Sequence, residues 1–333
     1  MKAYCTQFPP VAQVHRSVAM LLIILAAVAA APMLATFDPD NIGAIDLADA
    51  RLPPLTRTAA NRLHILGTDG QGRDILSGVL HGTRQTLTLA LFSVLAGGCA
   101  GVAAGFLAAL GGRFADAVIG RACDIQLAYP ALLVALLFDG LARTAVAGRD
   151  GEVPDFWIVA IALAFAIWPH FARTVRALAA AELAKPYILA AVSIGLRDKE
   201  IVVRHIWPNI RGQVIVLGTW MLTQAVACEA TLSFLGVGTS STSPSLGTMI
   251  RIGHGELLSG AWWIAGIPMI VLVALVTTIA LISDRLRDEI DPVLRSCVTN
   301  FSGRPQCSRN APSRLARSAK GNGSVSLRDA PAA

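Results

Sequence analysis

The chain has 333 residues, of which 54% are hydrophobic and 15% are charged, and its formal net charge is +6. A soluble domain has about 25% charged residues, so the composition argues against an ordinary globular enzyme. The apolar residues fall in blocks of roughly the 20 residues that a helix needs to cross a bilayer, which excludes intrinsic disorder and a small disulfide-bonded scaffold for the body of the chain.

Apolar runs along the chain predict an all-α integral membrane protein with six transmembrane helices. The predicted spans are 18–37, 86–110, about 125–141, 156–171, 214–237 and 261–282. The first run follows Arg16 and ends in alanines, as a secretory signal does, but its apolar part is longer than the usual signal core of about 7–15 residues. We therefore expect it to be a retained anchor.

The distribution of basic residues predicts the orientation of the spans. With the N-terminus inside, the inner segments before residue 296 hold 14 Lys and Arg residues and the outer segments hold 8. Inner loops carry the excess of positive charge, so both termini are expected in the cytoplasm. The predicted divisions are a cytoplasmic N-terminus (1–16), the first span with an outer loop (17–85), a five-helix transmembrane domain (86–284) and a cytoplasmic C-terminal segment (285–333).

The C-terminal segment is predicted to be disordered from about residue 296. It is rich in Ser, Pro, Gly and Arg and cannot bury enough apolar surface to fold. It also supplies most of the net charge. The positive charge therefore indicates orientation and possible contact with anionic lipid, and it is no evidence for nucleic-acid binding.

Small and charged residues mark two of the spans. Gly97, Gly101 and Gly105 recur at every fourth position, which allows another backbone to approach one helix face closely. The partner helix could belong to this subunit or to another one. Glu229 lies deep in the fifth run, where a carboxylate must face protein or a wet cavity, and both a functional role and a structural hydrogen bond fit that position.

The segment between the fourth and fifth spans predicts a cytoplasmic helix–turn–helix. Pro186 can open a helix, residues 187–194 are almost wholly apolar, and Gly195 is a typical helix stop. A second helix is expected to begin near Asp198 and to end before Pro208, because the residue before proline is pushed out of helical geometry. Two interpretations of the apolar helix stay open, an interfacial helix on lipid headgroups and a helix that docks in a groove of a cytoplasmic partner.

This segment resembles the EAA loop of ABC-importer permeases, in which Glu-Ala-Ala is followed by glycine and, further on, by a short apolar stretch that ends in proline. The matching residues are Leu189, Ala190, Ala191, Gly195, His205 and Pro208, with Tyr187 just before them. Leu189 stands where the family has glutamate, and Trp207 where it usually has leucine. The resemblance implies that the loop docks on an ATPase subunit, with the anchoring glutamate missing.

The rest of the chain is similar to the C-type permease subunit of dipeptide, oligopeptide and nickel importers. Residues 66–77 match its LGTDxxGRDxxS signature through Gly67, Thr68, Asp69, Gly72, Arg73 and Asp74. Residues 229–236 resemble its EASLSFLG segment, 244–247 its PSWG turn, with Leu246 in place of tryptophan, and 284–292 its closing DxLRDxxDP. The outer-loop signature is expected to meet a solute-binding protein.

The resemblance implies a type I ABC importer permease fold in the bacterial inner membrane. It implies a homologous B-type permease, two cytoplasmic ATPase subunits and an extracytoplasmic solute-binding protein as partners, with peptides as cargo and nickel chelates or glutathione as alternatives. No phosphate-binding loop, zinc motif or nucleophile elbow is present in the sequence, so we expect no enzyme activity, no cofactor and no metal site in this subunit.

Two functions of another class stay open from the sequence, an integral-membrane enzyme and a passive channel. An enzyme needs clustered reactive groups at membrane depth. Its candidates, Ser93, His170, Glu229 and Ser233, are spread over different predicted spans. The amphiphilic cytoplasmic loop has no evident use in a passive channel.

Overall fold

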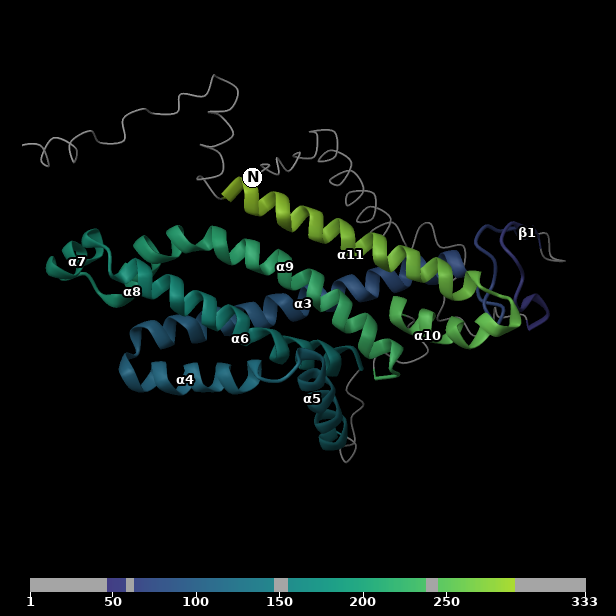
Figure 1. Ribbon diagram of the computed structural model, residues 1–333, viewed down its shortest axis with the longest axis horizontal. Coiled ribbons are helices and arrows are strands. Elements are labelled where there is room, and N and C mark those ends of the chain that lie inside the picture. The colour runs from purple at the N-terminus through teal and green to yellow at the C-terminus, as the bar shows by residue number, and fades with distance from the viewer. Residues whose placement is uncertain (1–46, 58–62, 147–154, 238–244, 291–333) are drawn as a thin grey trace, which may run out of the picture. The chain divides into compact units, whose positions relative to one another are not determined.

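The computed structural model describes residues 47–57, 63–146, 155–237 and 245–290, which are almost entirely helical (Figure 1). The predicted first span, both chain ends, Pro244 and the Asp291–Pro292 pair lie outside the described residues. Four described helices are long and apolar enough to cross a membrane, and a fifth crossing is possible if the bent pair α4–α5 counts as one span.

The elements follow one another in a simple order along the described chain. They are the short helix η2 (Leu47–Asp49), the antiparallel strands β1 (Thr56–Arg57) and β2 (Leu63–His64), α3 (Ile75–Leu110), α4 (Gly112–Leu127), α5 (Ala131–Val146), α6 (Asp155–Leu183), α7 (Pro186–Ser193), α8 (Asp198–Ile201), the π-helix η3 (Val202–Ile206), α9 (Trp207–Phe234), α10 (Leu246–Glu256), η4 (Leu257–Ser259) and α11 (Trp263–Ile290).

The long helices extend beyond the apolar runs that predicted them. Helix α3 begins at Ile75 and not at Thr86, because the Asp74 carboxylate accepts a hydrogen bond from the Ser77 backbone N–H and caps the helix there. Its first turns contain polar residues such as Arg84 and Gln85, which lower the hydropathy without weakening the helix. Apolar length therefore located the spans but underestimated the helices.

The predicted third span, 125–141, is not a single helix. Helices α4 and α5 meet at an angle of 99°, and the break falls at residues 128–130. Pro130 causes it, because proline has no backbone N–H and its ring disfavours helical geometry at Tyr129. Gln126 ties the bend to α6: its side-chain amide donates to the Phe165 carbonyl at 2.6 Å and accepts from the Trp168 indole at 2.9 Å.

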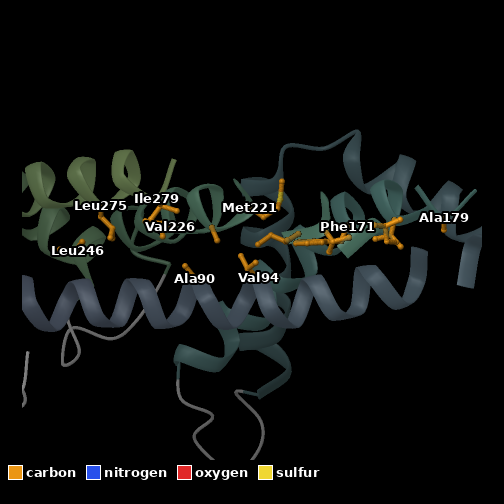
Figure 2. Close-up of a cluster of buried hydrophobic side chains, with 14 of the residues drawn as sticks. Ala90, Val94, Phe171, Ala179, Met221, Val226, Leu246, Leu275 and Ile279 are labelled. Carbon is orange, nitrogen blue, oxygen red and sulfur yellow. The ribbon is translucent and has the colours of Figure 1, made fainter. Parts of the chain in front are cut away.

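A continuous apolar cluster holds the long helices together (Figure 2). Its labelled members come from α3, α6, α9, α10 and α11: Ala90, Val94, Phe171, Ala179, Met221, Val226, Leu246, Leu275 and Ile279. Lipid tails are as apolar as these side chains, so close packing and van der Waals contact, more than exclusion of water, stabilise such an arrangement in a membrane.

Helices α3 and α6 share the most extensive helix contact. Gly97, Gly101 and Gly105 face α6 across it. A Cβ atom at Gly97 would lie 2.6 Å from the Ala164 carbonyl oxygen, and one at Gly105 would lie 2.8 Å from the Ala172 carbonyl oxygen. The glycines thus face a helix of the same chain, where any side chain would meet backbone.

The described part of the chain has two ends at which the motif residues of the sequence gather. Strands β1 and β2 lie beside the start of α11 at one end, and α7 lies at the other end, beyond the C-terminus of α6 and the N-terminus of α9 (Figure 1). We call residues 47–57 and 63–74 the knob, and residues 186–206 the α7 segment. The motif residues of the sequence lie mainly in these two regions.

Candidate functional site

The α7 segment carries an exposed apolar surface. Ile188 and Ala191 are buried against the neighbouring helices, whereas Leu189, Ile194 and Val203 have 59%, 79% and 66% of their surface exposed. Several apolar side chains with this much exposure within one short segment are typical of an interaction surface. The exposed residue at the EAA glutamate position is thus a leucine, which contributes to an apolar patch.

The turn that ends α7 is a Schellman motif with Gly195 at the left-handed position. Gly195 has φ +84°, and the Leu196 backbone N–H donates to the Ala191 carbonyl at 3.3 Å, the long-range bond that defines this motif. No atom lies within 4 Å of a Cβ at Gly195. The backbone conformation, and not crowding, is what requires glycine here.

Charges around the apolar patch are mainly basic. The side chains of Lys185, Arg197, Lys199 and Arg204 are exposed, and Glu200 is an exposed acidic neighbour. Such a surface suits a partner that offers an apolar groove with acidic groups beside it.

The helix after Gly195 does not end before Pro208, and the prediction that it would is wrong. Residues Lys199–Phe234 form one long helix in which η3 is a π-helical turn. Across this turn the Trp207 backbone N–H donates to the Val202 carbonyl, five residues back instead of four. The wider turn removes the clash that proline makes with the carbonyl four residues earlier, so Pro208 sits at the start of α9 and not after its end.

His205 lies in this π-helical turn, half-buried, with its ring centroid 6.3 Å from that of Tyr187. The Tyr187 hydroxyl donates to Glu182 Oε2 at 2.6 Å and accepts from Asn209 Nδ2 at 2.8 Å. Lys185 Nζ contacts the other carboxylate oxygen of Glu182 at 2.5 Å. Sequence analysis did not identify Glu182 or Asn209, because only the fold brings α6, α7 and α9 together.

The knob is built around hydrogen bonds from the polar residues of its signature. Thr68 accepts the Leu52 backbone N–H at 2.8 Å and donates to the Asp49 carbonyl at 2.6 Å. Asp69 accepts the backbone N–H groups of Gln71 and Arg73, both at 2.8 Å. Burial raises the pKa of the Asp69 carboxyl, against the lowering effect of these hydrogen bonds.

Asp74 joins the knob to α3. One carboxylate oxygen lies 2.9 Å from His64 Nδ1, and the other accepts from the backbone N–H and the hydroxyl of Ser77. Gly67 and Gly72 have φ +83° and +81°, which allows the two tight turns of the segment. Most of the signature thus shapes the knob from within, while Leu55, Leu63, Ile65 and Gln71 are exposed around it.

The knob is attached to the start of α11 and the end of α10. Arg51 Nε lies 2.9 Å from Glu256 Oε2, and the Trp263 indole N–H donates to the Thr68 carbonyl at 3.4 Å. The Arg51 guanidinium lowers the pKa of the Glu256 carboxyl. The side of the knob that faces α10 is therefore fixed by charge and hydrogen bonding.

Glu229 faces protein and is fully buried in α9. Its Oε1 accepts the Ser233 hydroxyl at 2.8 Å, and the hydroxyls of Thr86 and Ser245 lie close to the same carboxyl group. Ser245 also caps α10. Glu229 thus sits in a polar cluster that connects α3, α9 and α10. Thr86 and Ser245 were not identified from the sequence, since neither lies near Glu229 along the chain.

The enzyme candidates are not assembled into one site. Ser93 donates to the Leu89 and Ala160 carbonyls, bonds that serve helix packing, and only Ser233 contacts Glu229. Among the described residues, no group of three or more His, Cys, Asp or Glu side chains could hold a metal ion.

A family model described as the binding-protein-dependent transport system inner membrane component matches residues 101–296. The chain belongs to this family. It is therefore a multi-pass membrane protein that works with an ATPase and a binding protein, and it is a transport subunit and not an enzyme. The family resemblance predicted from the sequence is confirmed.

Individual relatives are similar over most of the chain. The di/tripeptide transport system permease protein DppC of Pseudomonas aeruginosa is 33% identical, over 83% of this chain and 86% of that protein. The glutathione transport system permease protein GsiD of Pectobacterium atrosepticum is 35% identical, over 70% of this chain and 74% of that protein. A solved chain of the inward-facing MetNI methionine ABC transporter is 22% identical, with a TM-score of 0.50, and aligns with 65% of this chain and 98% of that one. The family match and this structural likeness confirm the type I ABC importer permease fold.

Proposed function

We propose that this chain is the permease subunit of an ATP-driven peptide importer and forms half of its translocation pathway. A homologous B-type permease supplies the other half, two ATPase subunits bind on the cytoplasmic side, and a solute-binding protein docks on the outer side. Both termini and the α7 segment lie in the cytoplasm, in keeping with the excess of basic residues in the corresponding segments.

The exposed α7 surface carries this proposal. The α7 segment, with exposed Leu189 and Ile194, lies between two membrane-spanning helices, α6 and α9, so a partner bound to it can move both. Closure of the ATPase subunits on ATP then favours one of two arrangements of the spans and opens the pathway outward, as a rigid-body transition biased by nucleotide.

Peptides are the proposed cargo because relatives with the greatest coverage are named as di/tripeptide or peptide permeases. The glutathione permease relative makes glutathione the first alternative, and nickel chelates the second. Glutathione is itself a tripeptide, so a pathway wide and polar enough for di- and tripeptides also fits glutathione. Selection then rests with the binding protein.

The test is ATP-driven uptake by the reconstituted complex of both permeases, the ATPase subunits and the binding protein. We expect labelled dipeptide to accumulate in proteoliposomes only when ATP and binding protein are present. Uptake of glutathione or a nickel–histidine chelate, with none of dipeptide, would reassign the cargo. Uptake that proceeds without ATP would contradict the transporter class.

Two matched variants test the docking surface. Ile194→Asp places a charge on the α7 surface, and Leu55→Asp places one on the knob at a position of similar exposure, 79% against 73%. We expect Ile194→Asp alone to reduce co-purification of the ATPase subunits. Equal retention of the ATPase subunits by both variants would refute docking on the α7 segment.

The knob is proposed to meet the binding protein through its exposed rim, since its signature side chains face inward. A photo-crosslinking residue at Gln71 is expected to capture the binding protein. Capture of cytoplasmic partners alone would contradict both this contact and the orientation.

A further inference from the structure

Side chains from three helices meet at one hydroxyl group on the α7 side of the molecule. Glu182 is in the last turn of α6, Tyr187 is in the first turn of α7, and Asn209 follows the π-helical turn, near the start of α9. The Tyr187 hydroxyl bridges the other two side chains, at 2.6 Å and 2.8 Å. Among the described residues, no other side-chain hydrogen bond joins α7 to either of these helices.

The apolar contacts of α7 do not fix its direction by themselves. Ile188 and Ala191 bury one narrow face of α7, and van der Waals contacts of this kind depend weakly on orientation. Contacts of this kind limit rotation of a helix about its own axis less than a directional bond does. A hydrogen bond is directional, so the Tyr187 bridge limits this roll and thereby the direction in which Leu189 and Ile194 point.

Charge strengthens the bridge. Glu182 accepts from Lys185 with one oxygen and from Tyr187 with the other, and hydrogen bonds to an ionised acceptor are the stronger kind. The hydrogen bond to the Glu182 carboxylate raises the pKa of the Tyr187 phenol, and the same carboxylate raises the pKa of the Lys185 ammonium. At neutral pH the phenol is therefore a donor and Lys185 is a cation.

We propose that the Tyr187 hydroxyl is the joint through which movement of α7 reaches both flanking spans, with Glu182 and Asn209 as its two anchors. Tyr187 is a positioning residue: its hydroxyl contacts Glu182 and Asn209, and the ATPase contacts the neighbouring Leu189 and Ile194. This inference rests on the proposed docking of an ATPase on the α7 segment.

The test is Tyr187→Phe in the complete reconstituted transporter, which removes the hydroxyl and keeps the ring. The readout is the amount of solute transported per ATP hydrolysed. We expect this ratio to fall by at least about fivefold, the factor that corresponds to one hydrogen bond of ordinary net strength, since the hydroxyl makes two, with ATPase association unchanged. Tyr129→Phe is the matched control, since Tyr129 lies at the exposed α4–α5 bend and should leave the ratio unchanged.

A merely structural role predicts a different result. Tyr187→Phe would then lower the yield or thermal stability of the complex and leave the ratio per assembled complex at the wild-type value, which would overturn the proposal. Asn209→Ala provides a second route that spares the tyrosine ring. The double variant should be no worse than Tyr187→Phe alone, because loss of the hydroxyl already removes both hydrogen bonds, and a further loss on adding Asn209→Ala would contradict a shared joint.

The outcomes separate this inference from the function on which it rests. If Ile194→Asp fails to disturb ATPase association, the docking proposal itself is wrong. If Ile194→Asp disrupts docking while Tyr187→Phe transports solute at the wild-type ratio, only the joint is refuted.

Discussion

At the scale of single residues, Gly195 and Tyr187 determine how the exposed surface of α7 is presented. Gly195 ends the helix through a left-handed backbone with φ +84°, and Tyr187 holds the start of the helix to α6 and α9. Leu189 and Ile194 lie between these two constraints. The surface that the ATPase is proposed to grip is therefore constrained at both of its ends.

Gly195→Val should uncouple the transporter without preventing its insertion. A left-handed conformation costs a non-glycine residue about 1–2 kcal/mol, and a β-branched residue is the least able to adopt it. The turn is expected to relax and to shift the end of α7. The measurement is ATP-driven uptake normalised to the amount of inserted protein.

Gly260→Val is the control for this prediction. Gly260 has φ +86° and, like Gly195, nothing within 4 Å of a Cβ atom, but it lies in the turn between α10 and α11 near the knob. We expect this variant to keep its ATPase subunits and their coupling. If the two variants lose coupling equally, general backbone strain and not the α7 turn is responsible.

The Arg51–Glu256 ion pair predicts how the knob responds to acid. Arg51 lowers the pKa of Glu256 below its ordinary 4.5. A carboxyl whose pKa is lowered in the folded state stabilises that state fully above the ordinary pKa and loses the contribution as the pH falls through the lowered value. The attachment of the knob to α10 should thus be unchanged from neutral pH to about pH 5 and weaken only below 4.5.

Spin labels at Gln71 and Leu258, both exposed, report this attachment as a distance distribution in a cysteine-free background. The distribution should broaden in acid for the wild type. Glu256→Gln should show the broader distribution at every pH. A wild-type transition near neutral pH would point to another group as the one that titrates.

At the scale of elements, hydropathy predicted the positions of the spans and failed at their irregularities. Four apolar runs correspond to the long helices α3, α6, α9 and α11, because burial in lipid demands a continuous apolar stretch. Pro130 lies inside one predicted span and Pro208 was expected after the end of a helix, since a proline specifies local strain but not how the chain relieves it. The structure has a bend of 99° at the first and a continuous helix through the second.

The α3–α6 contact gives a prediction at neighbouring positions. A Cβ atom at Gly97 would lie 2.6 Å from the Ala164 carbonyl oxygen, which is backbone, whereas one at Gly98 would lie 3.4 Å from the edge of the Phe171 ring. Gly97→Ala should destabilise the folded chain by about 1–3 kcal/mol through overpacking. Gly98→Ala should be near neutral or gain slightly from helix propensity.

The comparison is the midpoint of thermal unfolding in detergent or nanodiscs for both variants beside the wild type. Both substitutions add one methyl group to adjacent residues of α3. The two variants therefore have the same amino-acid composition, and they should insert into the membrane equally well. Equal midpoints would show that Gly97 does not mediate the close approach of the helices.

At the scale of the whole molecule, the chain connects two ends with different chemistry through one packed set of helices. The knob end is shaped by buried polar contacts around Thr68, Asp69 and Asp74, and the α7 end exposes apolar side chains among basic ones. Sequence motifs located both ends. They could not show that the signature of the knob faces inward, or that Glu182 and Asn209 support α7, because those contacts join segments that only the fold brings together.

The central claim is that an ATPase subunit docks on the exposed face of α7. The most direct measurement is site-specific photo-crosslinking from Ile194, the most exposed apolar residue of that face, in the assembled transporter with and without ATP. We expect a cross-link to the ATPase subunit whose yield depends on nucleotide. Cross-links from Ile194 to lipid or to the binding protein, with none to the ATPase in either state, would contradict the claim.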